Sequence, residues 1–290
     1  MNQLLVFQSL WGMQRLRGDG ATASMEETIA RIAAAGFDGV TDHFHEHAHV
    51  AALMPLLKQY GLTIEGQVFP RTVADLEPAL ALAQEFGCHH ITMQILTCPM
   101  TVAECLPLLD GWQGLAERAG VAVYVETHRG RMTNDLLFTQ HLLDACPALR
   151  FTADLSHYVT AREIELPVPS EMQAMITRIL ERSRAFHGRV AGSHQVQLPL
   201  LGFPQHEPWR AQFESWWRQG FQIWRQNARP GESLSFTCEL GPAPYAITGP
   251  DGLDLTDRWA EALWLQDRAR VLWDEVTLAL CMDDGCGDRI

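Results

Sequence analysis

The stretch Val121-Ala-Val-Tyr-Val-Glu126-Thr-His128-Arg-Gly-Arg131-Met-Thr-Asn134-Asp135 decides the fold. Its five leading apolar or aromatic residues predict a strand that is buried on both faces, as in a parallel sheet. The strand ends on an acid, an imidazole and two guanidinium groups, and Thr133-Asn134-Asp135 can start a helix. Charged groups at the C-terminal end of a buried parallel strand are typical of the mouth of an α/β barrel, where such enzymes do their chemistry.

The rest of the chain predicts the same alternation of strand and helix. Further strands are expected over residues 4–11, 37–41, 62–69, 90–96, 149–154, 188–195 and 234–239. A proline-rich loop over 156–169 and a helix over 170–186 are expected between the sixth strand (149–154) and the seventh (188–195). Eight strand–helix units predict a (β/α)8 TIM barrel as a single domain over residues 1–279, with a C-terminal tail over 280–290. An open doubly wound sheet is disfavoured because no strand leads into a G-x-G-x-x-G loop.

Composition narrows the classes of partner. The formal charge of −13 argues against nucleic acid, whose phosphates need a basic surface. No apolar run approaches the roughly 20 residues of a membrane span, and the N-terminus lacks a basic segment followed by an apolar one. We therefore expect a cytoplasmic protein with no membrane partner.

Two residue types limit the chemistry. Lys58 is the only lysine and lies in a predicted helix, which excludes a Schiff base formed by a lysine at a strand end. The seven cysteines show no C-x-x-C spacing, and their odd number suits a reducing compartment. We expect them to be free thiols.

Four predicted strands end on residues of the kinds that bind metal ions. Glu126, Asp154, His194 and Glu239 follow the fifth to eighth strands. Because neighbouring strand ends share one rim of a barrel, these side chains are expected to converge. Three carboxylates and one imidazole suit one divalent ion, namely Mn²⁺, Mg²⁺ or Co²⁺, with Zn²⁺ also possible.

These residues resemble the pattern of the xylose-isomerase-like TIM barrels, which include ketose 3-epimerases, hydroxypyruvate isomerase, inosose dehydratase and endonuclease IV. The resemblance rests on Glu126, Asp154-Leu-Ser-His157, His194 and Glu239, in order over nearly the whole chain. It implies that Glu126 and Glu239 both bind the metal ion and move protons through an enediolate. His157 would then bind a substrate oxygen or orient Asp154.

Several other side chains are candidates for binding substrate. His128 and Arg131 follow Glu126, although an arginine there could instead pair with the acids. Trp11 could stack on a sugar face. His43 and His45 follow the second strand, where they could contact substrate or lie in a solvated loop.

The sequence thus predicts a metal-dependent isomerase or epimerase acting on a small sugar or sugar-derived ketone. A dehydratase on the same metal platform and a non-catalytic sugar-binding barrel are the alternatives. DNA repair is disfavoured because the segment after strand seven offers Gln205-His206-Glu207 where endonuclease IV has a D-x-H motif. Trp-rich helices near the C-terminus could supply the interface of a homo-oligomer.

Overall fold

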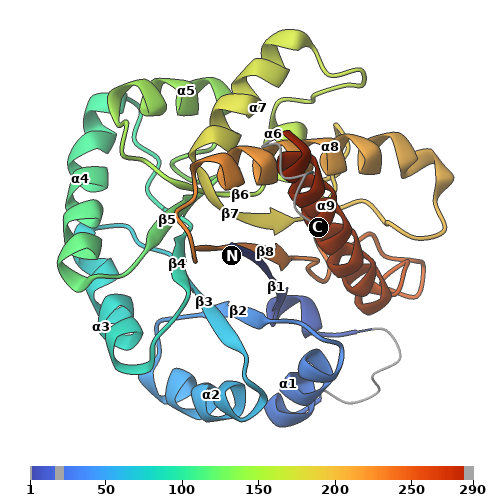
Figure 1. Ribbon diagram of the computed structural model, residues 1–290, viewed down its shortest axis with the longest axis horizontal. Coiled ribbons are helices and arrows are strands. Elements are labelled where there is room, and N and C mark those ends of the chain that lie inside the picture. The colour runs from blue at the N-terminus through green and yellow to red at the C-terminus, as the bar shows by residue number, and fades with distance from the viewer. Residues whose placement is uncertain (1, 17–22, 284–290) are drawn as a thin grey trace.

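In a computed structural model, which describes residues 2–16 and 23–283, the sheet is a closed barrel. Within these residues eight parallel strands each pair with the next, and β1 pairs with β8 (Figure 1). This confirms the expected (β/α)8 TIM barrel. The strands are β1 (Gln3–Ser9), β2 (Gly39–His43), β3 (Thr63–Val68), β4 (His90–Met93), β5 (Val123–Glu126), β6 (Phe151–Ala153), β7 (Ser183–Gly188) and β8 (Ser233–Cys238).

Helices surround the barrel on its outer side (Figure 1). Local signals fix several of their ends: Ser24 and Glu27 form a capping box before α1, and Gly61 and Gly120 end α2 and α4 in the left-handed conformation. The helices are α1 (Met25–Ala34), α2 (His47–Tyr60), α3 (Glu77–Phe86), α4 (Val102–Ala119), α5 (Leu136–Ala145), α6 (Ser156–Ala161), α7 (Ser170–Arg182), α8 (Glu207–Asn227) and α9 (Arg258–Asp283), with 3₁₀ turns η1 (Trp11–Met13), η2 (Val73–Leu76) and η3 (Pro204–His206).

Three of the four tryptophans of α8, namely Trp216, Trp217 and Trp224, belong to the core. Trp217 packs edge-on against Phe236 of β8 at 5.1 Å between ring centroids, and Phe221 packs in the same way against Phe186 of β7 at 5.5 Å. Trp216 is also fully buried. These rings hold α8 on the barrel.

The seventh strand begins earlier in the sequence than expected. The helix expected over 170–186 ends at Arg182, and β7 follows it directly from Ser183 to Gly188. The segment Ser-Arg-Ala-Phe-His-Gly has no apolar run and no glycine separates it from the helix, so the sequence pattern extends the helix too far. The predicted strand over 188–195 was therefore wrong.

Two further boundaries differ from expectation. The segment 156–169 starts with the helix α6, so only its later part is a loop. Helix α9 continues to Asp283, so residues 280–283 of the expected tail are helical, and residues 284–290 lie outside the described part of the chain.

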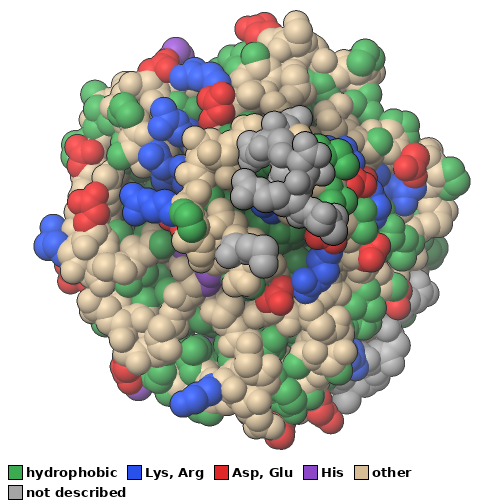
Figure 2. Space-filling view, in the orientation of Figure 1, with side chains coloured by type: hydrophobic (Ala, Val, Ile, Leu, Met, Phe, Trp, Pro, Cys, Tyr) green, Lys and Arg blue, Asp and Glu red, His purple; other side chains and the backbone are tan. Residues whose placement is uncertain are grey.

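The exterior of the described protein is mixed in character. Figure 2 shows acidic and basic side chains scattered over one face, with hydrophobic side chains between them. None of the described helices has the length and apolar composition needed to cross a membrane. The six cysteines in the described residues are free, as expected.

Replacing Gly188 by alanine should destabilise the barrel. A Cβ atom at Gly188 would lie 2.3 Å from Cζ of the buried Phe236 ring, and the cost of such overpacking is typically about 1–3 kcal/mol. Gly114→Ala in α4 is the control. Its Cβ would meet only the flexible Arg118 side chain at 3.2 Å, and alanine is favoured in a helix by about 0.5–1 kcal/mol. Thermal unfolding should show a lower Tm for G188A and an equal or higher Tm for G114A. Equal Tm values for G188A and the unmodified protein would contradict the close packing of Phe236 against Gly188.

Candidate active site

A pocket of about 200 Å³ lies at the C-terminal ends of the strands. Charged and polar side chains share its wall with aromatic rings. Its lining residues are Trp11, His43, Gln67, Phe69, Gln94, Glu126, His128, Arg131, Arg189, Glu239 and Tyr245. The mouth of the barrel is therefore both polar and aromatic, as expected for a small polar ligand.

Beneath this pocket the structure brings together three of the four residues expected to bind a metal ion. Glu126, Asp154 and Glu239 are all buried, and with His187 of β7 they offer ligand atoms that lie within 4.8 Å of one another. His194 does not join them, because it is exposed in the loop after β7. The expected role of His194 was wrong, and the early start of β7 places His187 there.

His187 is held from below by Glu65 of β3. The Glu65 carboxylate accepts hydrogen bonds from the hydroxyls of Thr41, Thr92 and Thr237 and lies 2.8 Å from His187 Nε2. Burial alone would raise the pKa of Glu65, but the charges and hydrogen bonds of His187 and His90 together outweigh burial and lower this pKa well below its ordinary value. An ionised Glu65 can only accept, so the Nε2–H of His187 donates to it and Nδ1 faces the acidic cluster.

A second cation, Arg189, enters the cluster from the end of β7. Its Nη2 donates to Glu239 Oε2 at 2.7 Å, its Nε donates to the Glu239 carbonyl at 2.9 Å, and its Nη1 lies 3.4 Å from Asp154 Oδ2. The guanidinium lies 4.7 Å from the centre of the Tyr245 ring and 5.7 Å from that of Trp11. Arg189 is thus a buried cation between two carboxylates and two aromatic rings.

The environments of Glu126 and Glu239 shift their pKa values in opposite directions. Burial raises the pKa of Glu126 well above its ordinary value, and neither of its carboxylate oxygens has a hydrogen-bond partner. Burial also acts on Glu239, but His187 and Arg189 outweigh it and lower its pKa to about 2. Near neutral pH Glu239 is a fixed anion, whereas Glu126 can hold a proton, which is the division expected of acid–base partners.

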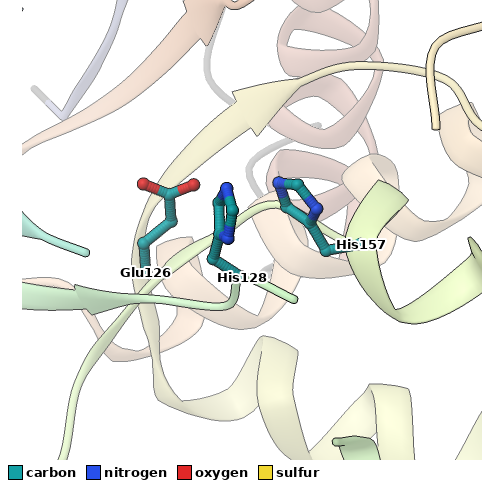
Figure 3. Close-up of side chains that lie close together, drawn as sticks. All are labelled: Glu126, His128 and His157. Carbon is teal, nitrogen blue, oxygen red and sulfur yellow. The ribbon is translucent and has the colours of Figure 1, made fainter. Parts of the chain in front are cut away.

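Two histidines stand beside Glu126, and Figure 3 shows all three side chains pointing to the same side. The rings of His128 and His157 lie 3.7 Å apart between centroids. Burial, with nearby guanidinium groups, lowers the pKa of His128 to about 3, and burial lowers that of His157 well below its ordinary value, so both are neutral near pH 7. His128 lines the pocket, whereas the fully buried His157 does not and has Nε2 3.5 Å from Asp154 Oδ2. Neither ring nitrogen of His157 has a hydrogen-bond partner, so both of its expected roles stay predictions.

The expected substrate-binding residues divide between two places. Trp11 and His43 line the pocket, and His43 packs edge-on against Phe69 at 5.2 Å between centroids. His45 is exposed and borders a separate cavity of about 280 Å³ on the other side of Phe69. His43 therefore remains a candidate contact, and His45 lies away from the acidic cluster.

Arg131 lines the pocket without being paired to an acid. Its guanidinium donates to Gln94 Oε1 at 3.3 Å and to the Gly130 carbonyl at 3.1 Å, and its Nε has no partner. Within residues 2–16 and 23–283 it forms no ion pair with a carboxylate. The alternative that Arg131 serves to pair with the acids therefore has no support in the geometry.

Several residues of the site were not predicted from the sequence. Gln67 and Gln94 extend from the ends of two apolar strands, a polar signal that could have identified them. His187 and Arg189 are two residues apart, and this spacing places both inside the barrel once the strand is recognised. Tyr245 lies in an irregular loop after β8, where no local pattern marks it.

The ligand atoms of Glu126, Asp154, His187 and Glu239 fit a divalent cation in part. Both oxygens of Glu126, Oδ2 of Asp154 and Nδ1 of His187 are buried without a hydrogen-bond partner, and carboxylate with imidazole is a common ligand set. The contact between His187 and Glu65 matches the carboxylate that commonly supports a metal-bound histidine. These residues could therefore hold a metal ion, although Arg189 already contacts two of the carboxylates.

Comparison with known proteins agrees with this fold. No family model matches the chain, and no curated protein matches it. A xylose isomerase-like TIM barrel protein from Mycobacterium smegmatis, solved with magnesium, is 15% identical with a TM-score of 0.59, over 93% of this chain and 97% of that one. A D-psicose 3-epimerase solved in the presence of D-fructose is 13% identical with a TM-score of 0.58, over 94% and 99%. A probable 3-DHS dehydratase from Bacillus anthracis is 14% identical with a TM-score of 0.52, over 94% and 98%. At such identities the likeness is one of fold, and it confirms the expected resemblance to xylose-isomerase-like barrels at that level.

Replacing Glu126 by glutamine should stabilise the protein above about pH 5, in buffer containing EDTA. An acid whose pKa is higher in the folded than in the unfolded state contributes stability below its unfolded pKa and loses it as the pH rises. Glutamine does not ionise, so the Tm of E126Q should exceed that of the unmodified protein at about pH 8. The difference should shrink towards about pH 4, where the Glu126 carboxyl is protonated in both states.

Glu239→Gln is the matched control, and its expected change in Tm at about pH 8 is a decrease rather than an increase. The lowered pKa of Glu239 means that its ionised form stabilises the folded state near neutral pH, and this stability is lost only as the pH falls towards about 2. Removing the carboxylate leaves Arg189 and His187 buried without this partner, at a cost of about 3–5 kcal/mol. A fall in Tm for both variants at about pH 8 would show that Glu126 is ionised and paired, against the assignment made here.

Proposed function

We propose that the protein is an enzyme that moves a proton next to the carbonyl group of a small sugar or sugar-derived ketone, as an isomerase or epimerase. One observation carries the proposal: Glu126 has a buried carboxyl group without a hydrogen-bond partner in the wall of the pocket. A buried acid without a hydrogen-bond partner is costly, and such groups are characteristic of acid–base catalysis.

The two acids take different roles in this proposal. Glu126 is the group that takes up and returns the substrate proton, because burial raises its pKa towards neutrality. Glu239 stays charged, since Arg189 and His187 hold its pKa at about 2. It anchors the two cations rather than sharing the proton transfer equally, which refines the symmetrical pair that the resemblance implied.

The pocket supports a polyhydroxy ligand. Gln67, Gln94 and Arg131 bring amide and guanidinium groups that can bind hydroxyl or carbonyl oxygens, and Trp11 offers an aromatic face for a sugar ring. A volume of about 200 Å³ limits the ligand to a small molecule. A small carbohydrate is therefore the proposed partner. The cytoplasmic location and the homo-oligomer expected from the sequence remain predictions.

A divalent ion fits this proposal as a cofactor. Glu126, Asp154, His187 and Glu239 would hold it, with Mn²⁺, Mg²⁺ or Co²⁺ suiting three carboxylates and an imidazole. When bound, such an ion supplies Lewis acidity at a substrate carbonyl. The chain's own part is to position the proton-transfer group and to exclude water from it.

A dehydratase is the second candidate, because loss of a hydroxyl group can follow the same proton removal at Glu126. The similar fold of a probable 3-DHS dehydratase is compatible with either outcome. A barrel that binds sugar without turning it over is the third.

The test is a panel of ketoses incubated with the protein in D₂O, with added Mn²⁺ and analysed by NMR and mass spectrometry. An isomerase or epimerase should incorporate deuterium at the carbon next to the carbonyl without loss of water, whereas a dehydratase should lose water. Glu126→Gln should slow this exchange by about 10²–10⁴-fold, the typical contribution of a positioned acid–base group, and should leave sugar affinity largely intact.

His45→Gln is the control for this experiment. His45 is exposed and lies outside the pocket, so its replacement should leave the exchange rate unchanged. Unaltered exchange in E126Q would overturn the role of Glu126. Sugar binding without any exchange in the unmodified protein would favour the non-catalytic barrel.

A further inference from the structure

Arg189 contacts two of the carboxylates that could hold a metal ion, Asp154 and Glu239. Its side chain is 2% exposed, and its two terminal nitrogens face Glu239 Oε2 at 2.7 Å and Asp154 Oδ2 at 3.4 Å. A guanidinium presents its N–H groups in a planar fork, which suits simultaneous contact with two carboxylates. Arg189 therefore hydrogen-bonds to one acid, Glu239, and lies within ion-pair distance of a second, Asp154.

The position of Arg189 is fixed on several sides. Its Nε donates to the Glu239 carbonyl at 2.9 Å, which anchors the guanidinium to the backbone at the end of β8. The Tyr245 and Trp11 rings lie over it at 4.7 and 5.7 Å, and Trp11 itself packs edge-on against Tyr245 at 5.1 Å. A cation held in this way is part of the folded structure rather than a mobile surface group.

These contacts engage both carboxylate oxygens of Glu239 and one of Asp154. Glu239 Oε2 contacts Arg189 and lies 3.0 Å from His187 Nδ1, while Glu239 Oε1 accepts from Gln67 at 3.3 Å. Asp154 Oδ1 accepts from both the backbone and the hydroxyl of Ser156. A divalent ion that used Asp154 Oδ2 and Glu239 Oε2 would have to displace the guanidinium from both.

We propose that Arg189 is the built-in cation of the acidic cluster and competes with a divalent ion for Asp154 and Glu239. Its positive charge offsets the repulsion among the carboxylates when no ion is bound, so that the barrel is stable without metal. Metal binding then has to overcome the Arg189 ion pairs, and the affinity for the ion is correspondingly lowered. The inference concerns the resting protein and does not depend on which reaction the site performs.

The direct test compares Mn²⁺ binding to the metal-stripped protein and to Arg189→Gln, by the loss of the EPR signal of free Mn²⁺. Glutamine has no charge and cannot bridge the two carboxylates, so R189Q should bind one Mn²⁺ at least about tenfold more tightly, within the range seen when groups around metal ligands are altered. Equal or weaker binding by R189Q would overturn the proposal, and so would the absence of binding in both proteins.

Arg131→Gln is the matched control. It removes a positive charge from the same pocket, but Arg131 donates to Gln94 and Gly130 and forms no ion pair with Asp154 or Glu239. Its Mn²⁺ affinity should stay within about threefold of that of the unmodified protein, since a more distant charge is partly screened. A similar gain in R131Q and R189Q would show a general charge effect and would contradict direct competition.

A second measurement covers the case in which R189Q does not fold. The Tm of the unmodified protein should be the same before and after removal of metal with EDTA, because Arg189 already compensates the acids. A clear fall in Tm on metal removal would show that an ion, not Arg189, is the resident cation. Neither experiment involves turnover, so failure here is distinct from the absence of deuterium exchange that would overturn the proposed function.

Discussion

The charged side chains inside the barrel depend on two cations from β7, His187 and Arg189. A carboxylate buried away from water is stable only beside a cation or a set of hydrogen-bond donors. His187 lies between Glu65 below and Glu239 above, at 2.8 and 3.0 Å, and Arg189 extends the pairing to Asp154. The same pairing sets the chemistry of the mouth, since it decides which acids are permanently ionised.

The geometry of β7 makes this arrangement possible. Side chains alternate along a strand, so His187 and Arg189 both point into the barrel while the residue between them points outward. That residue is Gly188, and the outward space that its side chain would fill is taken by Phe236, which also packs against Trp217 of α8. Packing on the outside of the sheet and charge placement on the inside are therefore linked through three consecutive residues.

Glu126 is the least closely paired of these acids. Its carboxyl group is as deeply buried as those of its neighbours, yet both oxygens lack a hydrogen-bond partner. Neutral His128 stands beside it. Among the described residues the nearest ion-pair partner of Glu126 is His187 at 3.8 Å, whereas Arg189 lies 2.7 Å from Glu239. Unequal pairing of similar acids is how one site obtains both a fixed charge and a group that can exchange a proton. The asymmetry could not be foreseen from two glutamates that each follow a buried strand.

The sequence by itself determined the barrel and three of its converging acids. Alternating apolar strands, glycine-ended helices and acids just after strands are local patterns, and they identified Glu126, Asp154 and Glu239. The tertiary structure alone decided the rest. The segment that forms β7 has no strand pattern of its own and is a strand because it pairs with β6 and β8, which is why His187 rather than His194 faces the acids. The placement of Arg189 among them likewise depends on contacts between residues about 35–50 positions apart, which no local pattern records.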